Sequence, residues 1–359
     1  MWGRKITWLI FGLVMCFASA LTVGADAYPP VVEGRTLVFP DDHGAHPEYR
    51  TEWWYVTGWA EDEQGQERGF QVTFFRVGTQ IGGDNPSLFA PRQLIIAHAA
   101  VTDPEQDRLL HAERMQRALE PLAGAETGHT RAWIDDWHLE WRDDHYHARV
   151  AAEDFAFALR FTPAGPPMLN GREGYSQKAP DPLNASYYYS RPQLALAGTL
   201  DIDGRTHQVR GQAWLDHEWS SEILPEEARG WDWIGINLHD GGALMAFQMR
   251  DHDGDALWAA ATLQSADGTA HVLAPEEVVF TPQRTWRSPR TDIAYPVEWT
   301  VEVGVRRFTL TPLIDDQELD SSATSGAIYW EGAVRVFEDG APAGRGYLEM
   351  TGHRERLRM

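Results

Sequence analysis

Ionisable and aromatic side chains alternate at 214–221, where the chain reads Trp-Leu-Asp-His-Glu-Trp-Ser-Ser. In an extended strand, successive side chains point to opposite faces, so Asp216 and Glu218 share one face while His217 and Trp219 share the other. A carboxyl group buried beside apolar rings has a raised pKa and can act as a proton donor. This stretch is therefore a candidate for acid–base chemistry.

A second stretch, Gly-Trp-Asp-Trp at 230–233, places the carboxyl group of Asp232 between two tryptophans. A buried carboxylate needs either a partner or a proton. Two interpretations stay open for both stretches. The carboxyl groups are functional acids, or they form structural Asp–His or Glu–Arg pairs between strands, with Arg76 and Arg250 as candidate partners.

The segment 174–190 joins a loop rich in Gly and Pro, Lys178 and three consecutive tyrosines. Lys178 is the only lysine after residue 27. If the tyrosines lie in a strand, Tyr187 and Tyr189 face one way and Tyr188 faces the other. The segment is either a rigid loop capped by a strand, or the mouth of a pocket with phenol donors.

Motifs for metals and cofactors are weak. His145 and His147 share a strand face, but a surface hairpin explains them better than a metal site without an evident third ligand. The acidic run 251–255 lacks the glutamate that a calcium loop needs, which favours a hairpin turn. The chain has no Gly-x-Ser-x-Gly elbow, phosphate loop or dinucleotide fingerprint. We expect no metal and no cofactor.

The elements that must position these residues are strands, because alternation and β-rich runs dominate and helical periodicity is nearly absent. Asp-Gly pairs at 240–241, 253–254 and 267–268 recur at intervals of one strand plus one turn, which predicts an antiparallel meander. Further Asp-Gly pairs stand at 203–204 and 339–340. The predicted strands are 52–60, 67–76, 93–101, 137–142, 145–150, 155–162, 194–202, 208–215, 231–238, 243–250, 256–263, 297–303, 307–312, 327–337 and 344–351.

A faint internal echo suggests two related units. Trp54 and Trp233 each open a strand whose return strand contains Phe-Gln and ends in Arg, at 70–76 and 247–250. Duplication of a barrel-forming unit and chance similarity between aromatic hairpins both explain the echo. We place the domain boundary between 28–222 and 223–359, where Pro225 and a short acidic stretch interrupt the strand pattern.

Composition excludes several classes of protein. The 359 residues are 43% hydrophobic and 23% charged, which is typical of a globular chain and not of a disordered one. The net charge of −22 argues against nucleic-acid binding. One cysteine allows no intrachain disulfide and no thiolate metal site. The 16 Trp, 11 Tyr and 14 Phe form either a sheet core or the walls of a pocket for a long apolar ligand.

Residues 1–27 resemble an export signal, with Arg4 and Lys5 before an apolar stretch and small residues at 25–27. Cleavage after Ala27 would send the protein to the periplasm or outside the cell. An uncleaved membrane anchor and lipidation of Cys16 are the alternatives.

Four motifs in order resemble the AttH-type lipocalin-like family, relatives of carotenoid 1,2-hydratase (hydroxyneurosporene synthase). They are Glu-Trp-Trp-Tyr-Val-Thr-Gly at 52–58, the segment 174–190, Leu-Asp-His-Glu-Trp at 215–219 and Tyr-Trp-Glu-Gly-Ala-Val at 329–334. The resemblance implies an all-β protein of two consecutive lipocalin-like (calycin-type) antiparallel β-barrels.

The hydratase activity implied by the resemblance adds water across an isolated C=C bond of an acyclic carotenoid without a cofactor. Such an alkene needs a positioned acid, and aromatic faces stabilise the resulting carbocation. The resemblance implies that Asp232 or Asp216 is the proton donor and that His217 orients it or activates water. Trp219 and Tyr188 would face the cation.

We therefore expect an apolar pocket near the domain junction that binds a long apolar or isoprenoid molecule. A non-catalytic periplasmic carrier of lipid, acting at a membrane surface or with an ABC-type transporter, is the main alternative, and a cyclase of the same fold is a third. The expected ligand-binding residues are Trp54, Tyr187, Tyr188, Tyr189, Lys178, Trp233 and Arg76.

Overall fold

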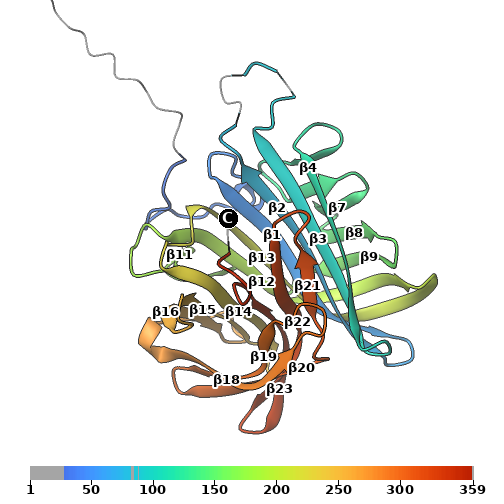
Figure 1. Ribbon diagram of the computed structural model, residues 1–359, viewed down its shortest axis with the longest axis vertical. Coiled ribbons are helices and arrows are strands. Elements are labelled where there is room, and N and C mark those ends of the chain that lie inside the picture. The colour runs from blue at the N-terminus through green and yellow to red at the C-terminus, as the bar shows by residue number, and fades with distance from the viewer. Residues whose placement is uncertain (1–27, 82–84, 88, 358–359) are drawn as a thin grey trace, which may run out of the picture.

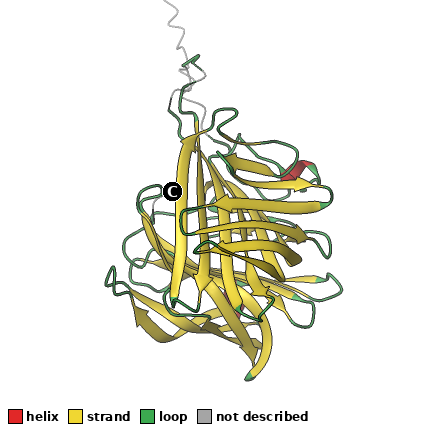
Figure 2. Ribbon diagram, turned by 90° about the vertical axis from the view of Figure 1, so that its right-hand side faces the viewer, coloured by secondary structure: helices red, strands yellow, loops and turns green. Residues whose placement is uncertain are grey.

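A computed structural model describes residues 28–81, 85–87 and 89–357. Strands make up almost all of the regular structure, as Figure 2 shows. Short 3₁₀ turns occur at Asp41–His43 and Pro275–Glu277. Within the described residues, no helix is long and apolar enough to cross a membrane. The predicted signal segment and Cys16 lie outside the described residues.

The first sheet is entirely antiparallel and has 13 strands among the described residues, in the order β4-β3-β2-β1-β13-β12-β9-β8-β7-β6-β5, with β10 and β11 paired to β12. Its end strands β4 and β5 contact each other, so the sheet curls into a nearly closed barrel. Its strands are β1 Thr51–Asp62, β2 Glu67–Gly78, β3 Gln93–Asp103, β4 Arg108–Arg117, β5 Ala123–Ala125, β6 Arg131–Ile134, β7 Trp137–Arg142, β8 His145–Ala151, β9 Phe155–Thr162, β10 Met168–Leu169, β11 Tyr175–Gln177, β12 Ala185–Ile202 and β13 Arg205–Glu222.

The second sheet is also antiparallel, with 10 strands in the described chain and the order β17-β16-β15-β14-β23-β22-β20-β19-β18, plus β21 paired to β22. Near its two ends, β16 lies against β18. Its strands are β14 Ala228–Leu238, β15 Ala243–Asp251, β16 Ala256–Gln264, β17 Ala270–Leu273, β18 Val278–Arg287, β19 Ala294–Val303, β20 Arg306–Pro312, β21 Glu318–Ser321, β22 Ala327–Glu338 and β23 Ala341–Met350.

Turn chemistry explains how consecutive strands pair. The β12–β13 hairpin turns at Asp203 (φ 49°) and Gly204 (φ 75°), and the β22–β23 hairpin turns at Asp339 (φ 50°) and Gly340 (φ 79°). Asp and Gly tolerate the positive φ that such two-residue turns require. The predicted meander is confirmed, because β14, β15, β16 and β17 pair in sequence. The all-β fold is likewise confirmed, with two antiparallel sheets of which one forms a nearly closed barrel.

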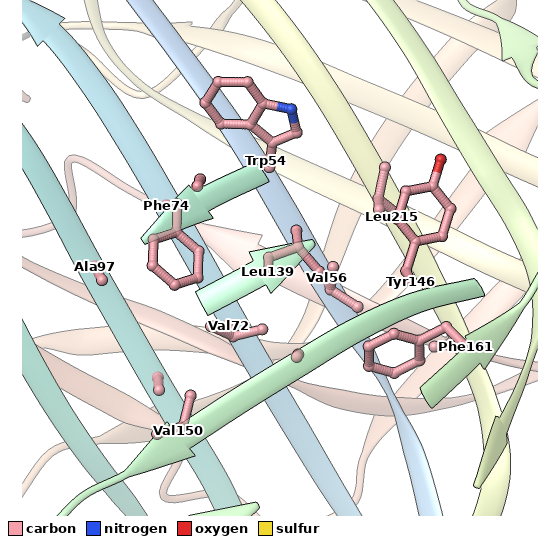
Figure 3. Packing of buried hydrophobic residues seen from close by; sticks show 14 of the residues in the cluster. Trp54, Val56, Val72, Phe74, Ala97, Leu139, Tyr146, Val150, Phe161 and Leu215 are labelled. Atoms are coloured by element: carbon pink, nitrogen blue, oxygen red, sulfur yellow. The ribbon is translucent and has the colours of Figure 1, made fainter. Parts of the chain in front are cut away.

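Side chains fill the interior of the first barrel. Figure 3 shows Trp54, Phe74, Tyr146 and Phe161 projecting from different strands into one packed cluster. All four are buried. These side chains form the packed apolar core of the first barrel.

The outer faces of the two sheets meet (Figure 1), with β22 and β23 lying against β1 and β2. Trp59 Nε1 donates a hydrogen bond of 3.0 Å to the carbonyl oxygen of Gly346. His98 Nδ1 lies 2.8 Å from the hydroxyl of Tyr329. The linking segment 223–227 joins the sheets. The division into domains at residue 222 stays a prediction.

Candidate functional site

A cavity of about 290 Å³ lies between the two sheets. One wall comes from β1, β2 and β13, and the other comes from β14, β15, β22 and β23. Ligand pockets are typically apolar and aromatic with a few polar groups. The aromatic side chains in these walls include Trp53, Tyr55, Phe75, Trp231, Trp233 and Phe247.

The two sheets contribute to this cavity in matching ways. Each supplies a tryptophan that lies directly opposite a phenylalanine and a glutamate on the neighbouring strands: Trp53, Phe75 and Glu218 in the first sheet, and Trp233, Phe247 and Glu349 in the second. The sequence echo aligned Trp54 with Trp233, but Trp54 belongs to the core of the first barrel. The structural counterpart of Trp233 is therefore Trp53, one residue earlier.

Asp216 is the most distinctive polar group in the cavity wall. Its carboxylate accepts hydrogen bonds from the Tyr188 hydroxyl (2.6 Å), the Ser190 hydroxyl (2.5 Å) and Trp214 Nε1 (2.6 Å). Burial raises the pKa of Asp216 to about 7, although these neutral donors favour the ionised form. Near neutral pH this carboxyl group can therefore both give and take a proton.

Two further acids line the wall formed by the second sheet. Glu331 and Glu349 lie directly opposite each other on β22 and β23. Burial raises the pKa of Glu349 to about 8, and burial together with the charge of Glu349 raises the pKa of Glu331 well above its ordinary value. Trp231 Nε1 donates to Glu349 (3.0 Å). The Tyr55 hydroxyl lies near enough to affect Glu331, but within the described chain no well-formed hydrogen bond joins them. Burial therefore favours the protonated form of both carboxyl groups in this wall.

Lys178 supplies a buried positive charge at the cavity. Its Nζ lies 2.7 Å from Oε1 of Glu218, which also accepts a hydrogen bond from Ser186. The same Nζ lies 4.5 Å from the ring centroid of Phe247 and 4.7 Å from that of Tyr188. The predicted faces of β12 and β13 are confirmed here, because Tyr188, Asp216 and Glu218 all point to the cavity side.

On the opposite face of β13, His217 points into the first barrel and meets Glu52. Oε1 of Glu52 lies 2.9 Å from His217 Nε2 and 2.8 Å from His46 Nδ1, and Oε2 lies 2.8 Å from Arg76 Nε. Burial alone would raise the pKa of Glu52, but the hydrogen bonds from His217 and His46 and the charge of Arg76 outweigh it, so this pKa is lowered. The sequence left open whether Arg76 forms a structural pair with a glutamate, and in the structure it pairs with Glu52.

Aromatic rings hold this ionic cluster in place. Trp54 stacks on His217 with ring centroids 4.6 Å apart, and Trp219 stacks on His46 at 3.8 Å. The Tyr189 hydroxyl lies 3.1 Å from His217 Nδ1. Tyr187 lies beside Trp219, at 5.8 Å between ring centroids.

Donor atoms of His46, Glu52 and His217 lie within 4.8 Å of one another, a spacing that also occurs in metal sites. The guanidinium of Arg76 already neutralises the Glu52 carboxylate. A second cation would meet that charge at close range. We interpret the cluster as an ionic network that fixes the end of the barrel.

Asp232 lies apart from both groups, in the second sheet. Its Oδ2 lies 2.8 Å from Arg250 Nε and 2.8 Å from Gln248 Nε2. Burial would raise the pKa of Asp232, but the charge of Arg250 and a hydrogen bond from His353 lower it below the ordinary value. An ionised, paired Asp232 is poorly suited to donate a proton, which is the reverse of its expected role.

The predicted site residues therefore separate into three environments. Asp216, Tyr188, Lys178 and Trp233 meet at the cavity. The ionic cluster and the packing around it contain His217, Trp219, Trp54, Tyr187, Tyr189 and Arg76. Asp232 pairs elsewhere.

Sequence reasoning did not assign the remaining cavity residues. Trp53 and Glu331 stand within motifs that carry the family resemblance, and Trp231 stands in the stretch with Asp232. These positions offered a signal, namely a charged or aromatic residue at alternate positions of a strand. The acid Glu349 stands in the predicted strand 344–351, where nothing distinguishes it from a surface residue.

Proteins of known structure share this architecture. A structure from Nitrosomonas europaea that carries the AttH designation is 50% identical, with a TM-score of 0.85, and covers 90% of this chain and 99% of its own. The crystal structure of kievitone hydratase from Nectria haematococca has a TM-score of 0.66 at 15% identity, covering 91% of this chain and 94% of its own. At that identity the second likeness concerns the fold alone.

At the sequence level, a kievitone hydratase from Fusarium solani subsp. phaseoli is 22% identical over 187 residues. The match spans 51% of this chain and 52% of that protein, about half the length of each. The family profile described as AttH-like matches residues 30–353. The match confirms the resemblance predicted from four sequence motifs, and the chain belongs to the AttH-like family.

Proposed function

We propose that the protein is a hydro-lyase that adds water to a C=C bond of an apolar ligand held between the two sheets. The observation that carries this proposal is Asp216, a buried carboxyl group in an aromatic cavity whose pKa of about 7 allows it to exchange a proton at neutral pH. The relationship to a protein named as a hydratase supports the same reaction class.

The cavity contains the groups that hydration requires. Asp216 gives its proton to one alkene carbon, and positive charge develops on the other carbon. The faces of Trp233 and Phe247 in the cavity wall stabilise that charge. The oxygen of a water molecule bonds to this carbon, and the water's surplus proton returns to Asp216. The carboxyl group is thus regenerated, and the reverse sequence removes water.

The ligand in this proposal is an isoprenoid or another apolar alkene. A volume of about 290 Å³ is at the lower end of the range for small-molecule pockets, so a carotenoid would place only one end of its chain there. Export to the periplasm or outside the cell is part of the proposal, since the sequence begins with a signal-like segment.

Labelled water tests the reaction directly. The purified protein is incubated in H₂¹⁸O with neurosporene or with kievitone, and mass spectrometry measures the gain of one labelled water. We expect Asp216→Asn to lower the rate about 100- to 10,000-fold, the usual contribution of a general acid. The matched control is Asp203→Asn at the exposed tip of the β12–β13 hairpin.

Ligand binding is followed separately by quenching of tryptophan fluorescence. We expect Asp216→Asn to retain binding. A wild-type protein that binds these ligands and never yields labelled product would contradict the hydro-lyase and favour the lipid carrier, with its membrane or ABC-type transporter partner.

A further inference from the structure

Lys178 has more hydrogen-bonding capacity than its surroundings use. An ammonium group has three N–H donors. Within the described residues, Glu218 is the oxygen acceptor that the Lys178 ammonium contacts, and the rings of Phe247 and Tyr188 flank it. Lys178 is 5% exposed, and burying such a charge is costly. A ligand oxygen in the cavity would accept a hydrogen bond from one of the remaining N–H groups.

Tyr188 fixes the spacing between this ammonium and the acid. The Tyr188 hydroxyl donates to Asp216 at 2.6 Å, while its ring centroid lies 4.7 Å from Lys178 Nζ. The Asp216 carboxyl group therefore lies at the hydroxyl end of the Tyr188 side chain, and the Lys178 ammonium lies over the ring of the same side chain. A ligand that reacts at Asp216 can place an oxygen a few bonds away against Lys178.

The ammonium of Lys178 narrows the class of alkene, because it lies beside Tyr188, whose hydroxyl donates to Asp216, and can stabilise negative charge on a ligand oxygen. In an alkene conjugated with a carbonyl group, negative charge develops on the carbonyl oxygen when water adds. A fixed cation at that oxygen stabilises this charge.

We infer that the ligand is an α,β-unsaturated carbonyl compound, and that Lys178 donates a hydrogen bond to its carbonyl oxygen. The inference deepens the proposed hydro-lyase function and rests on it for Asp216 as the group that exchanges the proton, but here water adds before a carbon is protonated. The water oxygen bonds to the β carbon, and the π electrons of the C=C bond move onto the α carbon and the carbonyl oxygen. The Asp216 carboxylate takes the water's proton and delivers it to the α carbon, giving a β-hydroxy carbonyl compound.

A pair of probes isolates the carbonyl contact. The enone trans-chalcone and the hydrocarbon trans-stilbene each have two phenyl rings and one trans C=C bond, and only chalcone has a carbonyl group, which lies between the C=C bond and one ring. We expect the wild-type protein to shift the absorption band of bound chalcone to longer wavelength, because hydrogen bonding by the ammonium polarises the carbonyl group.

The variant Lys178→Met/Glu218→Gln removes the ammonium without leaving an unpaired carboxylate in the cavity. It should lose the spectral shift and bind chalcone about 10- to 100-fold more weakly, the usual effect of losing a hydrogen bond to a charged group. Its affinity for stilbene should not change. Lys178→Arg should restore part of the shift, and circular dichroism checks that each variant folds.

Equal losses of affinity for chalcone and stilbene, or an unshifted chalcone spectrum in the wild-type protein, would overturn the inference. Hydration of isolated alkenes but not of chalcone in H₂¹⁸O would also overturn it, while leaving the proposed function intact. Shifted, Lys178-dependent binding of chalcone without water addition would support the carbonyl contact and count against the hydro-lyase.

Discussion

The two faces of β13 provide two buried carboxyl environments with opposite outcomes. Inside the first barrel, Glu52 meets Arg76, His46 and His217, and its pKa is lowered. On the cavity side, Asp216 accepts hydrogen bonds from neutral donors, and burial raises its pKa to about 7. Both side chains are almost fully buried.

The comparison shows that burial alone does not decide whether a carboxyl group is ionised. Hydrogen bonds from two histidines and the charge of Arg76 compensate for the lost hydration of Glu52, whereas hydroxyl and indole donors compensate only partly for that of Asp216. The barrel interior therefore holds an ion pair whose carboxylate is kept in the ionised form. The cavity holds a group whose protonation can change during a reaction.

The largest expected effect comes from removing the charged partner of Glu52 inside the first barrel. Arg76→Met leaves the buried carboxylate of Glu52 without its guanidinium partner, and also removes donors to the carbonyl oxygens of His46 and Tyr49. We expect the free energy of unfolding to fall by about 3–5 kcal/mol, as in other broken buried pairs. Urea denaturation measures this change.

Arg287→Met is the control for Arg76→Met, because Arg287 forms an exposed pair with Asp292. Its cost should stay below about 1 kcal/mol. Adding Glu52→Gln to Arg76→Met should recover part of the loss by removing the stranded charge. If Arg76→Met cost no more than the control, the barrel pair would have no structural role.

A second prediction uses the pH dependence of stability at the cavity. The pKa of Glu349 is raised from 4.5 to about 8 on folding, so the folded protein keeps a proton that the unfolded chain has lost between these values. Stability from this group is full below about pH 4.5 and falls as the pH rises to about 8. Glu349→Gln should make the fall between pH 5 and pH 8 smaller, by on the order of a few kcal/mol, because glutamine has no proton to lose.

Urea denaturation at several pH values gives this slope, with exposed Glu222→Gln at the end of β13 as the control. The Glu52 region should behave in the opposite sense, because a lowered pKa contributes stability above about pH 4.5 that is lost on acidification. An unchanged slope in Glu349→Gln would show that this acid is ionised in the folded protein.

The smallest expected effect compares neighbouring tyrosines on opposite faces. Tyr188→Phe removes a donor that lowers the pKa of Asp216, so the pH profile of hydration should move upward by less than about one unit. Tyr189→Phe removes a hydroxyl beside His43 and His217. It should leave the profile in place and cost about 1 kcal/mol of stability. Identical profiles for both variants would contradict the division into two faces.

Alternation along single strands was enough to predict much of this arrangement. The faces of Asp216 and His217, the opposite directions of Tyr188 and Tyr189, and several Asp-Gly hairpins all follow from local geometry. These predictions hold because strand period and turn chemistry are properties of a few adjacent residues.

The position of the cavity could not be predicted in the same way. It depends on which outer faces of the two sheets meet, and so on which distant parts of the chain line one cavity, as Phe75 and Trp231 do. His46, one of the partners of Glu52, lies in a loop before β1. No strand periodicity predicts the direction of its side chain there. The pairing of Asp232 with Arg250 distinguishes it from Asp216, the other residue expected as proton donor, and could not be predicted from the sequence.

The placement of Lys178 has a practical consequence. It is the only lysine beyond residue 27, and it lies buried at the junction of the two sheets. Its acylation by an amine-reactive reagent would therefore require the sheets to separate or the loop to lift. The rate of that single modification would therefore report how often the folded molecule opens at this junction, without any engineered label.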